Sequence, residues 1–140
     1  MNYKNIINSI MAAGATGVTL LIGGWDSVMK ILAILIILDY VTGIMKSAKE
    51  KKLDSSVGFN GLLKKAAIFV VVILAHQLDL TIPQEVPVFR TMVGYFYIAN
   101  EGISITENIA ILGVPLPSGL VGALKKLKEE NNNVNNEADL

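Results

Sequence analysis

The chain has 140 residues, of which 52% are hydrophobic and only 17% are charged, and its mean hydropathy is +0.52. Twelve basic and twelve acidic residues balance each other, so the chain has no general attraction for nucleic acid phosphates. The absence of cysteine excludes disulfides and thiolate metal sites. This length and composition favour one membrane domain.

The first apolar segment, residues 5–23, predicts a membrane helix weakened by polar residues and glycines. Its Ala13-x-x-x-Gly17 spacing would let two helix backbones approach closely. A cleaved signal peptide is the alternative, although only Lys4 supplies basic charge at its start. The turn at 23–26 brings Trp25 to interfacial depth.

Two stronger apolar segments follow, at 27–46 and 62–82. The first of them matches the length that crosses about 30 Å of hydrocarbon. Asp26 or Ser27 is expected to cap it, and an exposed Asp26–Lys30 pair is expected nearby. Asn60 is the expected cap of the second segment, after a turn at 58–61.

The region 46–65, between the apolar runs Val28–Met45 and Ala66–Ile82, holds six of the twelve basic residues and only two acidic ones. Lysines in short loops beside spanning helices resist translocation and therefore set orientation. The sequence predicts a helical hairpin whose loop stays in the cytoplasm. The topology determinants are Lys46, Lys49, Lys51, Lys52, Lys64 and Lys65.

The segment 88–112 predicts an amphipathic helix long enough to span. Five polar side chains fall within an arc of about 120° on a helical projection. They face either water at the membrane interface or a lumen or assembly seam inside an oligomer. These residues are Asn100, Glu101, Ser104, Glu107 and Asn108.

The lysines of 125–128 return to the cytoplasm if residues 88–112 span. An even number of crossings places both termini in the cytoplasm, so the lysines favour four spans, and three spans are the alternative. A short helix is expected at 118–128, and the polar segment 129–140 is expected to be disordered. The prediction is therefore an all-α membrane protein, a bundle of three to four transmembrane helices in a single domain over 1–128.

Two ionisable positions lie inside the apolar segments. Asp39 shares a helix face with Thr42 and Gly43, and it either pairs with a lysine near the interface or makes a polar contact between subunits or at a lumen in the cytoplasmic half. His76 and Asp79 lie one turn apart, which fits hydrogen bonding at a helix end better than a proton relay.

One histidine and no cysteine leave no catalytic constellation, metal-ligand spacing or phosphate loop. We expect no enzymatic activity and no cofactor.

Two separated motifs suggest a family. Asp39-Tyr-Val-Thr-Gly43 followed by the stretch from Leu53 to Lys65, and Tyr97–Asn108 with Gly-Val-Pro-Leu-Pro at 113–117, together resemble the toxin-secretion and phage-lysis holins of Gram-positive bacteria and their phages. The resemblance covers about residues 25 to 128.

The resemblance implies a multi-pass protein of the bacterial cytoplasmic membrane that forms homo-oligomers and permeabilises the bilayer. It also implies release of a phage endolysin or a large toxin, which need not touch the chain. Two alternatives are a small ion channel or transporter subunit, and an antiholin-like regulator of the same architecture.

Overall fold

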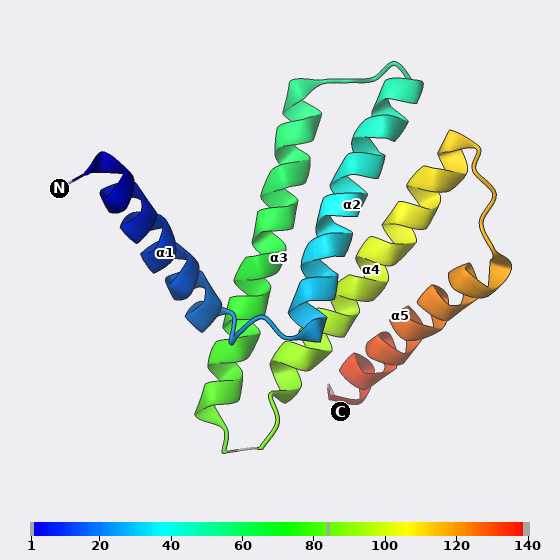
Figure 1. Ribbon diagram of the computed structural model, residues 1–140. Coiled ribbons are helices and arrows are strands. Elements are labelled where there is room, and N and C mark those ends of the chain that lie inside the picture. Colours follow the sequence, from blue (N-terminus) through cyan, green and yellow to red (C-terminus); the bar gives the residue numbers. More distant parts are fainter. Residues whose placement is uncertain (1, 84, 139–140) are drawn as a thin grey trace.

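The computed structural model describes residues 2–83 and 85–138, which form five helices and no strand (Figure 1). The all-helical prediction is confirmed. The helices are α1 (Tyr3–Leu21), α2 (Ser27–Lys49), α3 (Ser55–Thr81), α4 (Val88–Leu112) and α5 (Ser118–Ala138).

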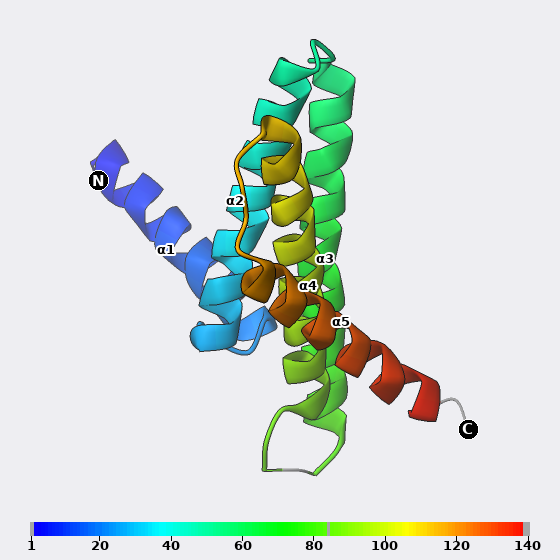
Figure 2. The ribbon, with the colours of Figure 1, turned by 90° about the vertical axis from the view of Figure 1, so that its right-hand side faces the viewer.

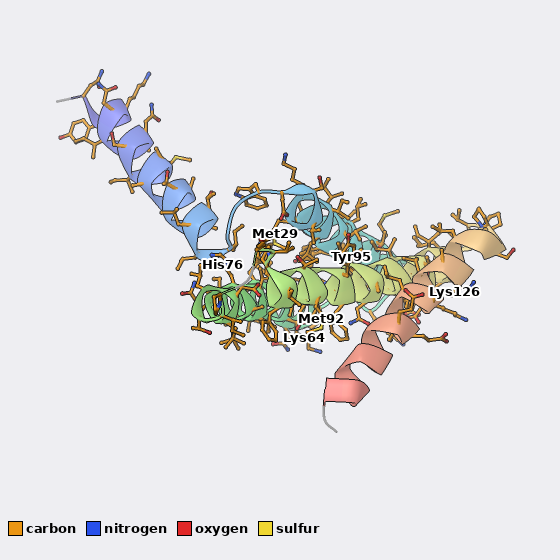
Figure 3. All side chains as sticks on the ribbon, turned by 90° about the horizontal axis from the view of Figure 1, so that it is seen from below. Met29, Lys64, His76, Met92, Tyr95 and Lys126 are labelled. Carbon is orange, nitrogen blue, oxygen red and sulfur yellow. The ribbon has the colours of Figure 1, made fainter. Side chains whose placement is uncertain are left out.

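The helices α2, α3 and α4 run side by side as a bundle, and α2 and α4 share its largest interface (Figures 1 and 2). Seen along the bundle, α1 and α5 project from opposite sides (Figure 3). α5 packs on α4, whereas α1 makes only a small contact with α3.

A thin apolar core holds the bundle together. Met29 and Leu32 of α2 and Val72 of α3 are completely buried, and Ile98 of α4 completes the contact. The outward faces are also apolar, since Val70 is 65% and Leu74 is 59% exposed. An apolar surface of this extent is costly in water and fits contact with lipid.

Two helices have the length and composition to cross a bilayer, Ser27–Lys49 and Gly58–Thr81. They coincide with the two strongest apolar segments of the sequence. The predicted crossings at 5–23 and 88–112 form helices α1 and α4 but do not meet the same criterion in the part of the chain that the structure describes.

The third helix begins earlier than the sequence predicts. Asp54 caps it, because its Oδ1 accepts hydrogen bonds of 2.8 Å from the backbone N–H and the hydroxyl of Ser56. The predicted cap at Asn60 and the turn at 58–61 are therefore wrong. Gly58 and Gly61 lie inside the helix and face Tyr40 on α2, where a Cβ atom would meet the Tyr40 hydroxyl at 3.7 Å and the edge of its ring at 3.9 Å, respectively.

The last helix also differs from its prediction, because α5 continues to Ala138 through the segment expected to be disordered. Once a helix exists, each further residue that joins it gains one backbone hydrogen bond, so polar residues can extend it. Residues 139–140 lie outside the described residues.

α5 packs closely on α4 at Gly102. A Cβ atom there would lie 2.7 Å from Cδ2 of Leu124, so the missing side chain lets α5 approach. Gly113 ends α4 in the left-handed conformation, with φ of 88°, which glycine adopts at little cost.

Candidate functional site

A cluster of five polar residues lies inside the bundle, at the end that carries the lysine-rich loop. Lys65 of α3 forms ion pairs with Asp39 of α2, at 2.5 Å between Nζ and Oδ2, and with Glu101 of α4. The three side chains are only 14%, 11% and 8% exposed. This polar cluster, completed by Thr42 and Asn108, therefore links all three helices of the bundle.

Asn108 completes the polar cluster from α4. Its Nδ2 donates to Oδ1 of Asp39 and to Oγ1 of Thr42, both at 3.2 Å. The Thr42 hydroxyl donates to the backbone carbonyl of Asp39 at 3.1 Å. Because two carboxylates share one ammonium group, Lys65 is the only cation that compensates them within the polar cluster.

The structure divides the five residues predicted for a seam. Glu101 and Asn108 bind α2 and α3 of their own chain, Ser104 lines a neighbouring pocket, and Asn100 is half-buried. Glu107 is exposed beside a cavity between α4 and α5 that Lys125 also lines.

Two of the three predicted cytoplasmic-half residues, Asp39 and Thr42, belong to the polar cluster. Asp39 pairs with a lysine, as one of the two interpretations requires. Gly43 lies next to it, since a Cβ there would be 3.8 Å from Nδ2 of Asn108.

The six predicted topology lysines serve different roles. Lys65 lies within the polar cluster, and Lys49 donates to the carbonyl of Ile111 at the end of α4, at 2.7 Å. Lys51 and Lys52 are exposed, whereas Lys46 and Lys64 line a pocket.

Sequence reasoning missed Arg90, which is only 2% exposed. Its Nε donates to the carbonyl of Ile22, its Nη2 to that of Gly24 at 2.7 Å, and its Nη1 to Oδ2 of Asp26 at 2.5 Å. A signal was present, because Arg90 is the only arginine in the chain and directly follows the Pro-rich loop. Arg90 thus joins the α1–α2 turn to α4.

Asp26 both caps α2 and pairs with this arginine. Its Oδ1 accepts from the backbone N–H of Met29 at 3.0 Å, which confirms the predicted cap. Its ion-pair partner is Arg90, and the expected pairing with Lys30 is wrong. Partial burial raises the pKa of Asp26, but hydrogen bonds from Arg90 and Met29 outweigh it, so the pKa lies below its ordinary value.

Asp79 supports the start of α4 from the neighbouring helix. Its two carboxylate oxygens accept hydrogen bonds of 2.8 Å from the backbone N–H groups of Phe89 and Arg90. This arrangement agrees with the predicted hydrogen bonding at a helix end. His76 packs against Gly23, where a Cβ would lie 2.6 Å from its ring.

The described residues contain no group of three or more histidines or acidic residues placed to hold a metal ion. What the polar cluster offers chemically is an ion-paired network of one ammonium and two carboxylates that fixes the relative positions of three helices.

Comparison with known proteins identifies the family. A sequence model of the bacteriophage holin family matches residues 16–129. The chain belongs to this family.

Curated relatives agree with this assignment. A protein named "Probable holin" from Bacillus phage phi105 is 38% identical over 74% of this chain and 76% of its own length. An uncharacterized protein of Clostridium perfringens is 47% identical over 81% of this chain and 84% of its own. A second C. perfringens protein, named after its place in the nagH 3' region, is 45% identical over 91% and 98%. No solved structure matches the chain.

Membership in the holin family and two apolar helices together indicate a membrane location. The motifs singled out in the sequence, from Asp39 to 117, all fall inside the matched region. The family assignment points to a membrane-permeabilising protein rather than to an enzyme.

Proposed function

We propose that the chain self-assembles in the bacterial cytoplasmic membrane and opens lesions large enough to release a folded protein, such as a phage endolysin or a toxin. Membership in the holin family carries this proposal. The apolar outer faces of α2 and α3 suit a lipid-embedded protomer.

In this proposal α1 and α4 also cross the bilayer, which gives four spans and places both termini in the cytoplasm. The lysines between α2 and α3 and those of α5 then lie on the same side. Placing a cysteine at Lys52, which is exposed between α2 and α3, would test this orientation. A maleimide that cannot cross the membrane should fail to label Lys52→Cys in intact cells. Labelling there would overturn the orientation.

The polar cluster gives the protomer a closed state. With Glu101 and Asn108 bound to α2 and α3, the polar residues left for contacts between protomers are Asn100, Ser104 and Glu107. We assign these three residues to the assembly seam or the lesion lining. Glu101 and Asn108 can join the same surface only after the polar cluster opens.

Leakage from vesicles tests this assignment. Purified protein is reconstituted into vesicles that hold a small dye together with a folded enzyme. Wild type should release both, and Glu107→Leu should change the extent of release while its helical content is retained. Equal release by Glu107→Leu and wild type would contradict the role of Glu107.

The same vesicles separate the two alternative functions. Ion-selective conductance with retention of the enzyme would identify a channel. An antiholin-like regulator would release nothing alone and would reduce release by an active holin.

A further inference from the structure

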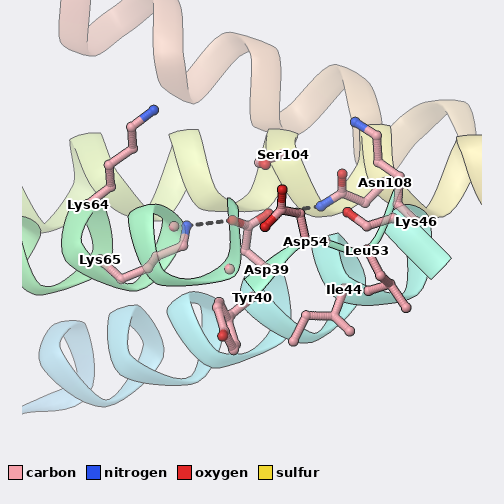
Figure 4. A pocket seen from close by; sticks show the side chains of 14 residues that line it. Asp39, Tyr40, Ile44, Lys46, Leu53, Asp54, Lys64, Lys65, Ser104 and Asn108 are labelled. Carbon is pink, nitrogen blue, oxygen red and sulfur yellow. Dashed lines mark hydrogen bonds and ion pairs between the residues drawn. The ribbon is translucent and has the colours of Figure 1, made fainter. Parts of the chain in front are cut away.

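A pocket of about 470 Å³ opens between α2, α3 and α4 at the end of the bundle that carries the lysine loop (Figure 4). Lys46 and Lys64 stand at its two ends, while Lys65 turns toward Asp39. The hydroxyl-bearing residues Ser47 and Ser104 also line it. The pocket therefore offers cationic and hydroxyl donors to a single ligand.

The lining of this pocket carries an excess of positive charge, because three lysines (Lys46, Lys64 and Lys65) face two carboxylates (Asp39 and Asp54). Lys65 is held in ion pairs by Asp39 and by Glu101, whereas Lys46 and Lys64 form no ion pair with a carboxylate among the described residues. The Asp54 carboxylate is directed to the start of α3, where its Oδ1 accepts two hydrogen bonds from Ser56 as the helix cap.

A second, more apolar groove of about 340 Å³ adjoins the pocket between α3 and α4. Lys64 and Lys65 line both spaces. From these lysines the groove continues over Ala67 and Val71 and is closed on the α4 side by Tyr97. The cationic pocket is thus joined to an apolar groove that runs along a candidate membrane span. This combination is complementary to an anionic headgroup with its acyl chain.

We propose that this composite site binds one anionic phospholipid, with its phosphate between Lys46 and Lys64 and an acyl chain against Ala67 and Val71. Free phosphate would fill only the pocket, which is why the adjoining groove favours a lipid. Basic pockets between helices near the membrane surface bind such headgroups. The proposal rests on the membrane location and is independent of whether the chain opens lesions.

The test measures spin-labelled phosphatidylglycerol and phosphatidylcholine bound to the full chain in phosphatidylcholine vesicles. The salt concentration is about 1 M, because a Debye length of about 3 Å suppresses diffuse attraction. Wild type should immobilise phosphatidylglycerol in preference to phosphatidylcholine. Equal binding of the two lipids would overturn the proposal.

Two variants remove the same charge from different places. Lys46→Gln/Lys64→Gln should remove most of the preference for phosphatidylglycerol over phosphatidylcholine. Lys51→Gln/Lys52→Gln removes two exposed lysines of the same loop that line neither space, and it should leave the preference unchanged. An equal loss in both would show a diffuse surface effect and refute the site.

Two further measurements separate the headgroup from the acyl chain. Ala67→Phe fills the groove at an exposed position and keeps every lysine, so it should weaken lipid binding. Soluble glycerol phosphate should not displace the lipid at millimolar concentration. If glycerol phosphate displaces the lipid and Ala67→Phe still binds the lipid fully, the site binds phosphate alone. Circular dichroism checks that each variant is folded. Enzyme release from vesicles is measured separately, so a failure of the lipid-site proposal can be told apart from a failure of the proposed lesion-forming function.

Discussion

Replacing Lys65 by methionine tests whether the polar cluster holds the bundle together. Lys65→Met keeps the length of the side chain but leaves the carboxylates of Asp39 and Glu101 without their shared cation. Removing one partner of a buried ion pair costs about 3–5 kcal/mol of stability, mainly because the remaining charge is uncompensated. Two carboxylates lose their cation here, so we expect the upper part of that range.

Glu101→Gln is the matched comparison within the polar cluster. It keeps the shape of the side chain and leaves one ammonium facing one carboxylate, Asp39. We expect a loss of about 0.5–1.5 kcal/mol, the net contribution of a single hydrogen bond. Lys64→Met is the external control, because this neighbour is exposed and unpaired among the described residues, and it should stay within about 0.5 kcal/mol of wild type.

The assay is equilibrium unfolding of the full chain in mixed micelles by sodium dodecyl sulfate, followed by circular dichroism. The expected order of stability is wild type and Lys64→Met, then Glu101→Gln, then Lys65→Met. Unfolding of Lys65→Met at the same detergent fraction as Lys64→Met would refute the stabilising role of the polar cluster.

Three further predictions follow from other contacts. Gly102→Leu should displace α5 at a cost of about 1–3 kcal/mol, which should appear as faster hydrogen exchange in residues 118–130. Adding Leu124→Ala to this variant should restore protection. Unchanged exchange in Gly102→Leu would contradict the close packing. Arg90→Leu should raise hydrogen exchange at 22–26, because the carbonyls of Ile22 and Gly24 lose their donor, and exchange equal to wild type would exclude that anchoring role. The Asp26–Arg90 pair lowers the folded-state pKa of Asp26 below its ordinary value of 3.8, so its stabilisation is complete above that value and disappears as pH falls through the lowered pKa. The stability advantage of wild type over Asp26→Asn should therefore be present at about pH 6 and vanish in strong acid, and an advantage that does not change with pH would contradict the pairing.

The sequence predicted those features that depend on local pattern. Hydropathy located α2 and the apolar part of α3, and the projection of 88–112 placed α4 at its observed bounds. The cap at Asp26 followed from residue type and position. The start of α3 did not, because Gly58 and Gly61 are typical of a turn, whereas the helix is capped by Asp54 ahead of them and continues through both glycines.

The sequence identified most residues of the candidate site but not how they are arranged. Asp39, Thr42, Glu101 and Asn108 were all selected by their polarity in apolar surroundings. Lys65, the ion-pair partner of Asp39 and Glu101, was assigned to topology, because a lysine near a loop gives the same sequence pattern whether its side chain faces water or turns inward. Pairing across helices far apart in the chain depends on how the helices pack, which a single sequence does not encode locally.

Expression of the chain in growing bacteria that also produce a folded cytoplasmic reporter enzyme tests the central claim most directly. We expect an abrupt halt of growth followed by the appearance of active enzyme outside the cell membrane, after wall digestion with added lysozyme. Continued growth, or a halt with all of the enzyme retained inside intact membranes, at an expression level verified in the membrane fraction, would contradict it.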